Sequence, residues 1–541
     1  MRPSFLLLPG IAVSCLLAGK ILIHYFQLES YQFPGYFRTI RRNLLKSILP
    51  GICLDVILAI LLVLFTFVFR TGYSWWVFLL EAVILIFCGA VIGRLCSEKN
   101  AKKPFVLTPR IKRLYFVGFL VMTLILFLIV ITAGNPDKPS DFENHRINAA
   151  ALLLFPAFLP LWIALSGLLA WPVEKLISEL YFRDAQKILK SRPDLIKIGI
   201  TGSWGKTSVK FILGTILEEK YHTLVTPASY NTPMGVTKVI RTNLEPGHRV
   251  FVSEMGARHV GDIREMCRLV HPTIGLITSV GPQHLDTFKT VERVAGTKYE
   301  LIEALPASGL SFFADDDGLC RSLYDKTTGN RYISGLDSTR DDIWAEEIVY
   351  SQEGSSFLLC TDDTRVRCTT HLLGELNIRN ILLCALVAMK LGLTDAEIVR
   401  GISKIRPVEH RLQLITNPGG ITVIDDSFNS NILGAKQAFA VLRSFGGKRV
   451  VVTPGMVELG EQEYDLNREF GSAMADCCDV AILVGRKRGK AIGEGLADAG
   501  FDADNIHYVA DLKEATTLIG TLVHSGDTVL FENDLPDNYS E

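Results

Sequence analysis

Residues 196–213 read IKIGITGSWGKTSVKFIL, an apolar strand-like run followed by glycines around Gly-Lys-Thr and then a helix-like run. The strict nucleotide-binding pattern has a glycine five positions before Gly205, where this sequence has Ile200. A loop between a strand and a helix still directs backbone N–H groups and the positive helix end at one point. We therefore predict a site for phosphates and a magnesium ion, with a purely structural turn as the alternative, at Gly202, Ser203, Gly205, Lys206, Thr207 and Ser208.

Composition limits the classes of function. The chain has 541 residues, which is enough for several domains, because single cores stop growing at roughly 250–300 residues. Its net charge of −1 provides no broad basic surface, so we expect no nucleic-acid partner. The 11 cysteines include no C-x-x-C pair, which predicts neither a zinc site nor a disulfide framework and favours a reducing compartment.

Five apolar stretches predict membrane-spanning helices. Each is about 20 residues long, which matches a hydrocarbon core of roughly 30 Å at 1.5 Å per residue. The polar loops between them argue against the alternative of buried core helices. The stretches are 4–23, 50–69, 75–94, 114–133 and 149–171.

The charges of the loops predict the orientation in the membrane. Loops 24–49 and 94–113 are rich in Lys and Arg and should be cytoplasmic, whereas 70–74 and 134–148 can face outwards. Five spans then place everything after Trp171 in the cytoplasm. A cleaved signal peptide over 1–19 would reverse this order and put the glycine-rich loop outside the cell, so we reject that reading.

The rest of the chain alternates short β-rich runs with helical patterns, which predicts parallel α/β units. A break near Arg406-Pro407 separates two such blocks, and a hairpin is expected at 345–370. The predicted fold class is thus α/β behind a bundle of about five transmembrane helices. The predicted domains are a transmembrane region (1–180), a central phosphate-binding domain (181–407) and a Rossmann-like C-terminal domain (408–541).

Polar residues follow two further predicted strands. The strand RVFVSEM contains Glu254 near its end, and the strand TIGLITS runs into VGPQHLD, which places His284 and Asp286 beyond it. The carboxyl ends of parallel strands meet at one edge of a sheet, where ligands bind. A carboxylate and an imidazole beside a phosphate loop are suited to holding magnesium that bridges ATP. Taken singly, each side chain could equally be a surface or capping residue.

Nine motifs in order resemble those of the Mur ligase family, which also explains Ile200, because that family uses T-G-x-x-G-K-T-[ST]. The resemblance covers roughly residues 190 to 531, and "DDSFN" and "GMVELG" favour the branch that acts on cell-wall precursors. The motifs are TGSWGKTS at 201–208, NTPMGV at 231–236, SEMGARHVGDI at 253–263, GPQHLDTF at 281–288, KYELIEALP at 298–306, GELNIRN at 374–380, HRLQ at 410–413, DDSFNSN at 425–431 and GMVELG at 455–460.

The resemblance implies ATP-dependent amide-bond formation. A substrate carboxylate would take the γ-phosphoryl group of ATP to give an acyl phosphate, and an amine would then displace phosphate. It also implies a catalytic set of Lys206, His284 and Lys298, and a metal set of Thr207, Glu254, His284 and Lys298, with Lys298 carbamylated. Further nucleotide contacts would come from Asn377, Asn380, Arg411, Asp426 and Asn429, with Phe428 beside them.

The departures from the family lie mostly on the acceptor side. The family's amino-terminal domain, which grips a UDP-linked sugar, is replaced by the five predicted spans. Ser279 stands where an asparagine is usual, Asn467 where a histidine is usual and Ile432 where a proline is usual, and the usual Lys-Gly-Ser near the end is missing. The chemistry is therefore expected to be kept and the substrate to be changed.

We thus expect a multi-pass ligase of the bacterial cell membrane, with its catalytic domains in the cytoplasm. Its expected partners are ATP, magnesium, the bilayer, a cell-envelope precursor that a lipid could carry, and an amino acid or dipeptide. Two alternatives stay open: a polyglutamate-type capsule ligase, and a non-catalytic ATP-binding membrane scaffold.

Overall fold

A computed structural model describes residues 7–68, 75–97, 104–132, 152–228, 230–315, 318–351, 354–416, 419–427, 432–457 and 459–533. The chain divides into two compact units, one up to Glu179 and one from Leu180 onward. The expected outward loops at 70–74 and 134–148, together with Phe428 and Asn429, lie outside the described residues. The two units are described separately below.

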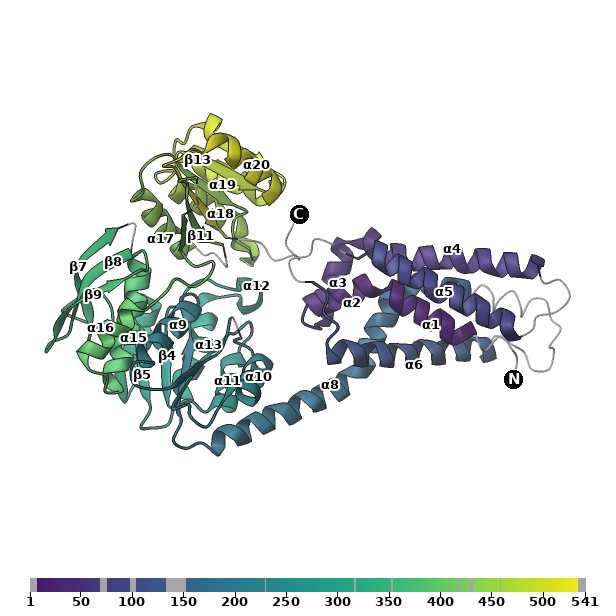
Figure 1. The fold of residues 1–541 in the computed structure, drawn as a ribbon, viewed down its shortest axis with the longest axis horizontal. Helices are drawn as coiled ribbons and strands as arrows, with labels where there is room; N and C mark the ends of the chain where they lie inside the picture. The colour runs from purple at the N-terminus through teal and green to yellow at the C-terminus, as the bar shows by residue number, and fades with distance from the viewer. Residues whose placement is uncertain are drawn as a thin grey trace. The chain divides into compact units, whose positions relative to one another are not determined.

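The first unit is helical, and four of its segments are long and apolar enough to cross a membrane: Leu44–Leu64, Trp75–Leu95, Pro109–Ile131 and Leu152–Lys190. A fifth span results if two short helices that meet at 51° are counted together. The helices of this unit are α1 (Leu7–Ala18), α2 (Lys20–Leu28), α3 (Phe33–Arg42), α4 (Leu44–Val68), α5 (Trp75–Leu95), α6 (Pro109–Thr132), η2 (Pro156–Phe158) and the first part of α8 (Leu159–Lys190) (Figure 1).

The span predicted over 4–23 corresponds to two short helices, α1 and α2, that meet at an angle of 51°. The helix breaks at Gly19, which lies between α1 and α2. A Cβ atom at this position would be 2.8 Å from Cδ1 of Ile163 and 3.0 Å from the carbonyl oxygen of Cys15. A side chain larger than that of glycine would therefore not fit at this break without movement, which hydropathy alone does not reveal.

Small residues bring α1 and α5 together. A Cβ atom on Gly10 would meet Ala82 at 2.5 Å, and one on Gly89 would meet the carbonyl oxygen of Ser14 at 2.5 Å. Close backbone approach at small residues is typical of helix pairs in membranes. The outward faces of the neighbouring helices are apolar, with Val63 71%, Phe87 69% and Phe116 63% exposed. A continuous apolar exterior of this kind is expected where lipid covers the protein.

The basic segment 24–49 is not the loop that was expected. Most of it is helical, and α3 buries Tyr36, Thr39 and Ile40 while Arg38 and Arg41 are exposed. The Tyr36 hydroxyl donates to the carbonyl oxygen of Pro160 at 3.0 Å. Three of the four Lys and Arg residues of this segment, Arg38, Arg41 and Arg42, therefore lie on a packed amphipathic helix.

The second unit begins with a six-stranded parallel sheet in the order β2-β3-β1-β4-β5-β6. Its buried side chains alternate between two cores: Val250 and Val252 face α9, α15 and α16, whereas Phe251 faces α10, α11, α13 and α14 (Figure 1). The strands are β1 (Ile196–Thr201), β2 (Thr223–Val225), β3 (Val250–Glu254), β4 (Ile274–Ile277), β5 (Leu310–Ala314) and β6 (Asn330–Ser334). The helices are α9 (Lys206–Leu217), α10 (Pro233–Asn243), α11 (Asp262–Val270), α12 (Leu285–Phe288), α13 (Val291–Glu303), α14 (Leu319–Lys326), α15 (Glu375–Lys390) and α16 (Asp395–Ser403).

A small antiparallel sheet lies between β6 and α15 in the sequence. Its strands are β7 (Trp344–Ser351), β8 (Gly354–Cys360) and β9 (Arg365–Thr370), paired in that order. The hairpin expected at 345–370 is therefore extended by a third strand. Phe357 and Leu359 of β8 point into the same core as α9 and α15.

The C-terminal part forms a second six-stranded sheet in the order β10-β11-β15-β12-β13-β14, with β10 antiparallel at the edge. α17, α18 and α19 pack on one face and α20 on the other. The connection between α16 and β10 contains the predicted domain boundary at 407–408. The elements are β10 (Gln413–Thr416), β11 (Thr422–Asp426), α17 (Ile432–Arg443), β12 (Arg449–Thr453), η3 (Gly460–Gln462), α18 (Glu463–Met474), β13 (Val480–Val484), α19 (Arg486–Asp498), η4 (Ala503–Asn505), β14 (Ile506–Val509), α20 (Leu512–Leu522) and β15 (Thr528–Glu532).

Candidate functional site

The glycine-rich loop joins β1 to α9, as predicted. Gly205 has a φ of 79°, a left-handed conformation that favours glycine. A Cβ atom on Gly202 would lie 2.1 Å from Oγ1 of Thr278, so no larger residue fits there without movement. Lys206, Thr207 and Ser208 open α9 directly after this turn. The loop therefore presents its backbone N–H groups at a helix N-terminus.

The end of β4 supports this loop. The Ser279 hydroxyl accepts a hydrogen bond from the Trp204 amide at 2.8 Å and lies 2.9 Å from the Trp204 carbonyl oxygen, to which it donates. Ser203 Oγ donates to the Gly281 carbonyl and accepts from its amide, both at 3.0 Å. Ser279, one of the departures from the family pattern, is therefore part of the scaffold of the loop.

Lys206 is folded onto its own loop. Its Nζ donates to the carbonyl oxygens of Gly202 at 2.6 Å and Ser203 at 3.0 Å. The pKa of Lys206 is lowered to about 8, chiefly by burial and also by Arg411, while Glu254 opposes the shift. A cation that is desolvated and donates to neutral carbonyls is well placed to exchange them for an anion.

Glu254, at the end of β3, is the most heavily bonded carboxylate beside the loop. Its Oε2 accepts from Thr207 Oγ1 at 3.0 Å and from Lys210 Nζ at 3.1 Å, and its Oε1 accepts from Asn231 Nδ2 at 3.0 Å. Burial acts to raise the pKa of Glu254, but Lys210 and Lys206 hold it below its ordinary value. The structure thus brings Thr207 and Glu254 together, as expected at the common carboxyl edge of parallel strands.

His284 follows β4, the strand on the other side of β1. It has a φ of 51° and precedes α12, and its carbonyl oxygen accepts from Thr287 Oγ1 at 3.0 Å. Asp286 belongs to α12, but its side chain lies outside the described part of the structure. Among the residues that the structure describes, no group of three or more His, Cys, Asp or Glu side chains is arranged to hold a metal by itself.

Lys298 is fully buried in α13, with 1% of its surface exposed. Burial places its pKa well below the ordinary value of a lysine; Lys206 lowers it further, and Asp262 acts in the opposite direction. A solvated helix lysine would show neither property. Lys298 therefore lies in the electrostatic reach of the loop, as the resemblance implied.

The amino-terminal end of α15 reaches the same sheet edge. Asn380 is 3% exposed, and its Oδ1 would be 3.1 Å from a Cβ atom on Gly205, so it borders the loop. The Asn377 side chain instead donates to the carbonyl oxygen of Leu373 at 2.9 Å and stabilises its own helix start. Of the two asparagines, Asn380 is the one placed beside the glycine-rich loop.

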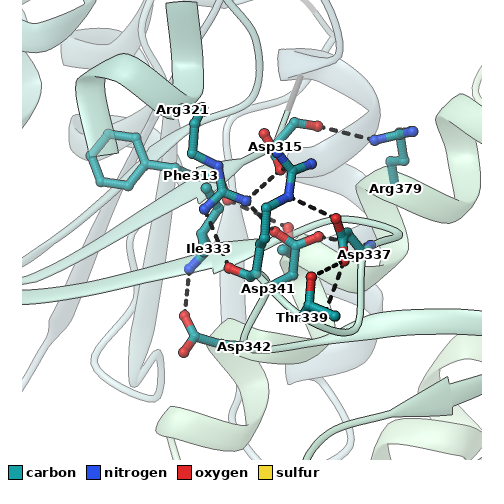
Figure 2. A network of polar contacts seen from close by, with 11 residues as sticks. Phe313, Asp315, Arg321, Ile333, Asp337, Thr339, Asp341, Asp342 and Arg379 are labelled. Atoms are coloured by element: carbon teal, nitrogen blue, oxygen red, sulfur yellow. Dashed lines mark hydrogen bonds and ion pairs between the residues drawn. The ribbon is translucent and has the colours of Figure 1, made fainter. Parts of the chain in front are cut away.

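A network of charged residues anchors this end of α15 (Figure 2). Arg379 donates to Glu375 at 2.8 Å and to the carbonyl oxygen of Asp315 at 3.0 Å, which ties the helix to the end of β5. Arg321 bridges Asp315 and Asp341, the latter at 2.7 Å. The polar cleft beside this network has a volume of about 380 Å³. The network fixes the helix that carries Asn377 and Asn380.

Removing the central cation of this network is expected to destabilise the second unit. Arg321→Leu removes the Arg321 partner of the buried Asp341 and leaves Asp315 with its longer pair to Arg340 at 3.5 Å, and breaking a buried pair costs about 3 kcal/mol. We expect the midpoint of thermal unfolding to fall by several degrees, measured by circular dichroism on the full chain. The matched control is Arg365→Leu, because Arg365 is 63% exposed and pairs with Glu346 at only 3.5 Å. Equal midpoints for the two variants would contradict the anchoring role.

Two predicted residues of the C-terminal domain are electrostatically linked to this site. Burial lowers the pKa of Arg411, against the influence of Asp426 and Glu254. Burial raises the pKa of Asp426 to about 6, and its Oδ1 accepts from the Leu412 amide at 3.1 Å. Arg411 thus interacts with acidic groups of both domains. Asn429 lies outside the described residues.

Sequence reasoning missed two residues that hold Glu254. Asn231 lies in the quoted motif NTPMGV, but no role was assigned to it. Lys210 lies one helical turn after Lys206, and this i, i+4 spacing was the available signal. Its side chain is 0% exposed, whereas a lysine in an amphipathic helix is normally expected at the surface.

Comparisons with known proteins agree with this architecture. Residues 200–388 match the family model of the Mur ligase middle domain, and residues 410–532 match that of the Mur ligase glutamate ligase domain. The chain is 30% identical, over 62% of its length and 69% of the relative, to the UDP-N-acetylmuramoyl-tripeptide–D-alanyl-D-alanine ligase of Mycobacterium bovis.

Solved structures share the fold of the second unit. The crystal structure of MurF from Acinetobacter baumannii matches with a TM-score of 0.60 and 25% identity, covering 66% of this chain and 77% of that one. The MurF ligase of Thermotoga maritima in complex with ADP matches with a TM-score of 0.59 and 24% identity, covering 66% and 80%. The residues matched by the middle-domain model, 200–388, contain the glycine-rich loop, α9 and Glu254.

Proposed function

This chain belongs to the Mur ligase family of ATP-dependent ligases that form ADP and phosphate, and from this premise we propose how it acts on a peptidoglycan precursor. The proposed reaction joins a precursor carboxylate to the amino group of an amino acid or dipeptide. The observation that carries the proposal is the arrangement of Lys206, Thr207 and Glu254 around one loop at the carboxyl edge of the parallel sheet.

The donor set of this edge fits ATP with magnesium. The Thr207 hydroxyl and the Glu254 carboxylate lie 3.0 Å apart, and hard oxygen atoms are the ligands that magnesium prefers. His284 and a carbamylated Lys298 would complete the metal set. When bound, magnesium would neutralise phosphate charge and orient the phosphates. Nucleotide contacts would come from the loop, Asn380, Arg411 and Asp426, with Asn377 and Asn429 in the same set.

The proposed chemistry has two displacements. The precursor carboxylate attacks the γ-phosphorus of ATP, the bond from this phosphorus to the β-phosphate oxygen breaks, and ADP leaves. The amine then attacks the acyl phosphate, and phosphate departs with the electrons of the acyl carbon–oxygen bond while the amine loses a proton to solvent. Lys206 would stabilise the negative charge that moves to the leaving phosphate, as cationic clamps do in phosphoryl transfer.

The apolar helices of the first unit suggest a membrane-bound enzyme. We propose that they anchor the ligase in the cell membrane, with the catalytic domains on the cytoplasmic side where ATP is available. A membrane position favours a lipid-linked form of the precursor as acceptor. Four candidate spans, or five with α1 and α2 counted together, support the anchoring, and the exposed apolar side chains of α4, α5 and α6 fit a lipid environment.

The proposed orientation predicts which positions are labelled on intact cells. A cysteine placed at Ser140, between the last two predicted spans, should react with a membrane-impermeant thiol reagent. A cysteine at Ser403, the last residue of α16, should react only after the cells are opened. The unmodified chain is the control, since it already contains 11 cysteines. Equal labelling of both positions on intact cells would contradict the proposed orientation.

A substrate panel tests the proposed activity. The purified full chain in detergent would be given ATP, magnesium and pairs of one acceptor with one amine, and ADP release would be followed. The acceptors would be UDP-linked and lipid-linked muramoyl peptides and a polyglutamate, and the amines would include D-alanyl-D-alanine and single amino acids. ADP release that requires a muramoyl acceptor together with an amine is expected. ADP release with the polyglutamate acceptor, and not with either muramoyl acceptor, would favour a capsule ligase instead.

A further inference from the structure

Lys210 is one of two lysines among the largest fully buried side chains of the described structure, the other being Lys298. It lies on α9, one turn after Lys206, yet the two side chains have different partners. Lys206 donates to the carbonyls of its own loop. Lys210 donates to Glu254 at 3.1 Å and to the carbonyl oxygen of Ala228. It therefore links α9 to the end of β3 and to the segment that follows β2.

The Lys210–Glu254 pair is sealed from solvent, with the two side chains 0% and 1% exposed. A buried ion pair contributes little net stability, because desolvating two charges offsets their attraction. Stability alone therefore does not explain the choice of lysine at this position. The geometry offers another reason, since both carboxylate oxygens of Glu254 are fixed.

The oxygen that Lys210 contacts is the one that faces the loop. Glu254 Oε2 accepts from both Lys210 and the Thr207 hydroxyl, while Oε1 accepts from Asn231 at 3.0 Å. Lys210 and Thr207 therefore both donate to Oε2 from the same helix, Thr207 from its first turn and Lys210 from the next. Without Lys210 the carboxylate could rotate away from the hydroxyl.

We propose that Lys210 is a positioning residue for the divalent cation that accompanies ATP, because it keeps the Glu254 carboxylate beside the Thr207 hydroxyl. This inference rests on the proposed function, in which Glu254 and Thr207 hold magnesium. Lys210 acts through Glu254 and does not contact the nucleotide. Its removal should therefore affect only the part of ATP binding that depends on magnesium.

Calorimetry of ATP binding to the full chain in detergent, with magnesium and with a chelator, tests this inference. In the wild type, magnesium should strengthen ATP binding. The magnesium gain is the ratio of the ATP affinity with magnesium to the ATP affinity in the chelator. In Lys210→Met this ratio should fall at least tenfold, while the ATP affinity in the chelator stays within twofold of wild type. The matched control is Lys220→Met, just beyond the end of α9, whose side chain donates to the carbonyl oxygen of Gly392 at an exposed site.

A double variant separates positioning from a merely structural role. If Lys210 acts through Glu254, then Lys210→Met/Glu254→Gln should lose no more of the magnesium gain than Glu254→Gln alone. The double variant leaves neither charge unpaired, so it serves even if Lys210→Met folds poorly. A Lys210→Met protein that keeps the full magnesium gain, or a double variant that loses tenfold more than Glu254→Gln, would overturn the inference. Absence of ATP binding by the wild type would overturn the proposed function itself.

Discussion

Lys206→Ala is expected to weaken ATP binding by about two orders of magnitude, because a hydrogen bond to a charged group contributes about 1.5–3 kcal/mol. Lys206 supplies the loop's own positive side chain, and its Nζ donates to the carbonyl oxygens of Gly202 and Ser203. Exchange of these neutral acceptors for phosphate oxygens would give a strong charge-assisted contact. Calorimetry with magnesium present measures the loss directly.

The matched control is Lys513→Ala, which removes an exposed lysine from α20 and should leave ATP affinity unchanged. Thermal unfolding of Lys206→Ala shows whether the loop survives, since the variant also loses two hydrogen bonds to its own backbone. ATP affinity equal to wild type in a folded Lys206→Ala protein would mean that the loop is a structural turn.

Lys298→Ala should separate ATP binding from ligation. We expect ligation to fall at least a hundredfold while ATP affinity stays within about threefold of wild type. Lys298 is buried, burial and the charge of Lys206 lower its pKa, and an ammonium group there would repel both that lysine and a magnesium ion. A low pKa leaves a neutral amine, which can add to carbon dioxide and become a carbamate. The carbamate supplies an oxygen ligand suited to magnesium.

Rescue by small carboxylates distinguishes this role from a packing defect. Acetate or formate should partly restore turnover of Lys298→Ala, because either can place a carboxylate where the carbamate would lie. The matched control is Lys238→Ala, which removes an exposed lysine from α10. Wild-type ligation by Lys298→Ala across a range of magnesium concentrations would show that the carbamate is not needed.

The sequence was most informative where a local pattern determines a local structure. The apolar run before Gly202 predicted the strand β1, and the helix-like run after Gly205 predicted α9. Both patterns reflect burial, of β1 inside the sheet and of one face of α9 against it. The common edge at which β3, β1 and β4 end was expected because the carboxyl ends of parallel strands lie at one edge of a sheet, whereas the order of the strands was not predicted.

The pairing of charges inside the site could not be predicted in the same way. Lys210 is next to Val209 on the buried side of α9, and a lysine is acceptable there because Glu254 and the Ala228 carbonyl oxygen, both from other segments, accept its hydrogen bonds. The same holds for Arg321, whose partners are Asp315, just after β5, and Asp341, in the connection between β6 and β7. Such contacts depend on tertiary packing, to which neither periodicity nor propensity is sensitive.

In the helical unit, too, the sequence predicted some elements and missed others. Hydropathy predicted the later spans well, because it depends on the length and apolar content of a segment. It predicted one span at the start of the chain where the structure has α1 and α2, and a loop where the structure has α3. At these places Gly19 packs against Ile163 and Tyr36 donates to Pro160, both on α8, and hydropathy does not describe such contacts.

The central claim is that this chain forms an amide through an acyl phosphate, and oxygen transfer tests it most directly. An acceptor with ¹⁸O in its carboxylate would be ligated by the full chain with ATP and magnesium, and the released phosphate would be analysed by mass spectrometry. The account predicts one ¹⁸O atom in each phosphate, because a carboxylate oxygen leaves with the phosphoryl group. Phosphate without ¹⁸O, formed at the same rate as the amide, would contradict it.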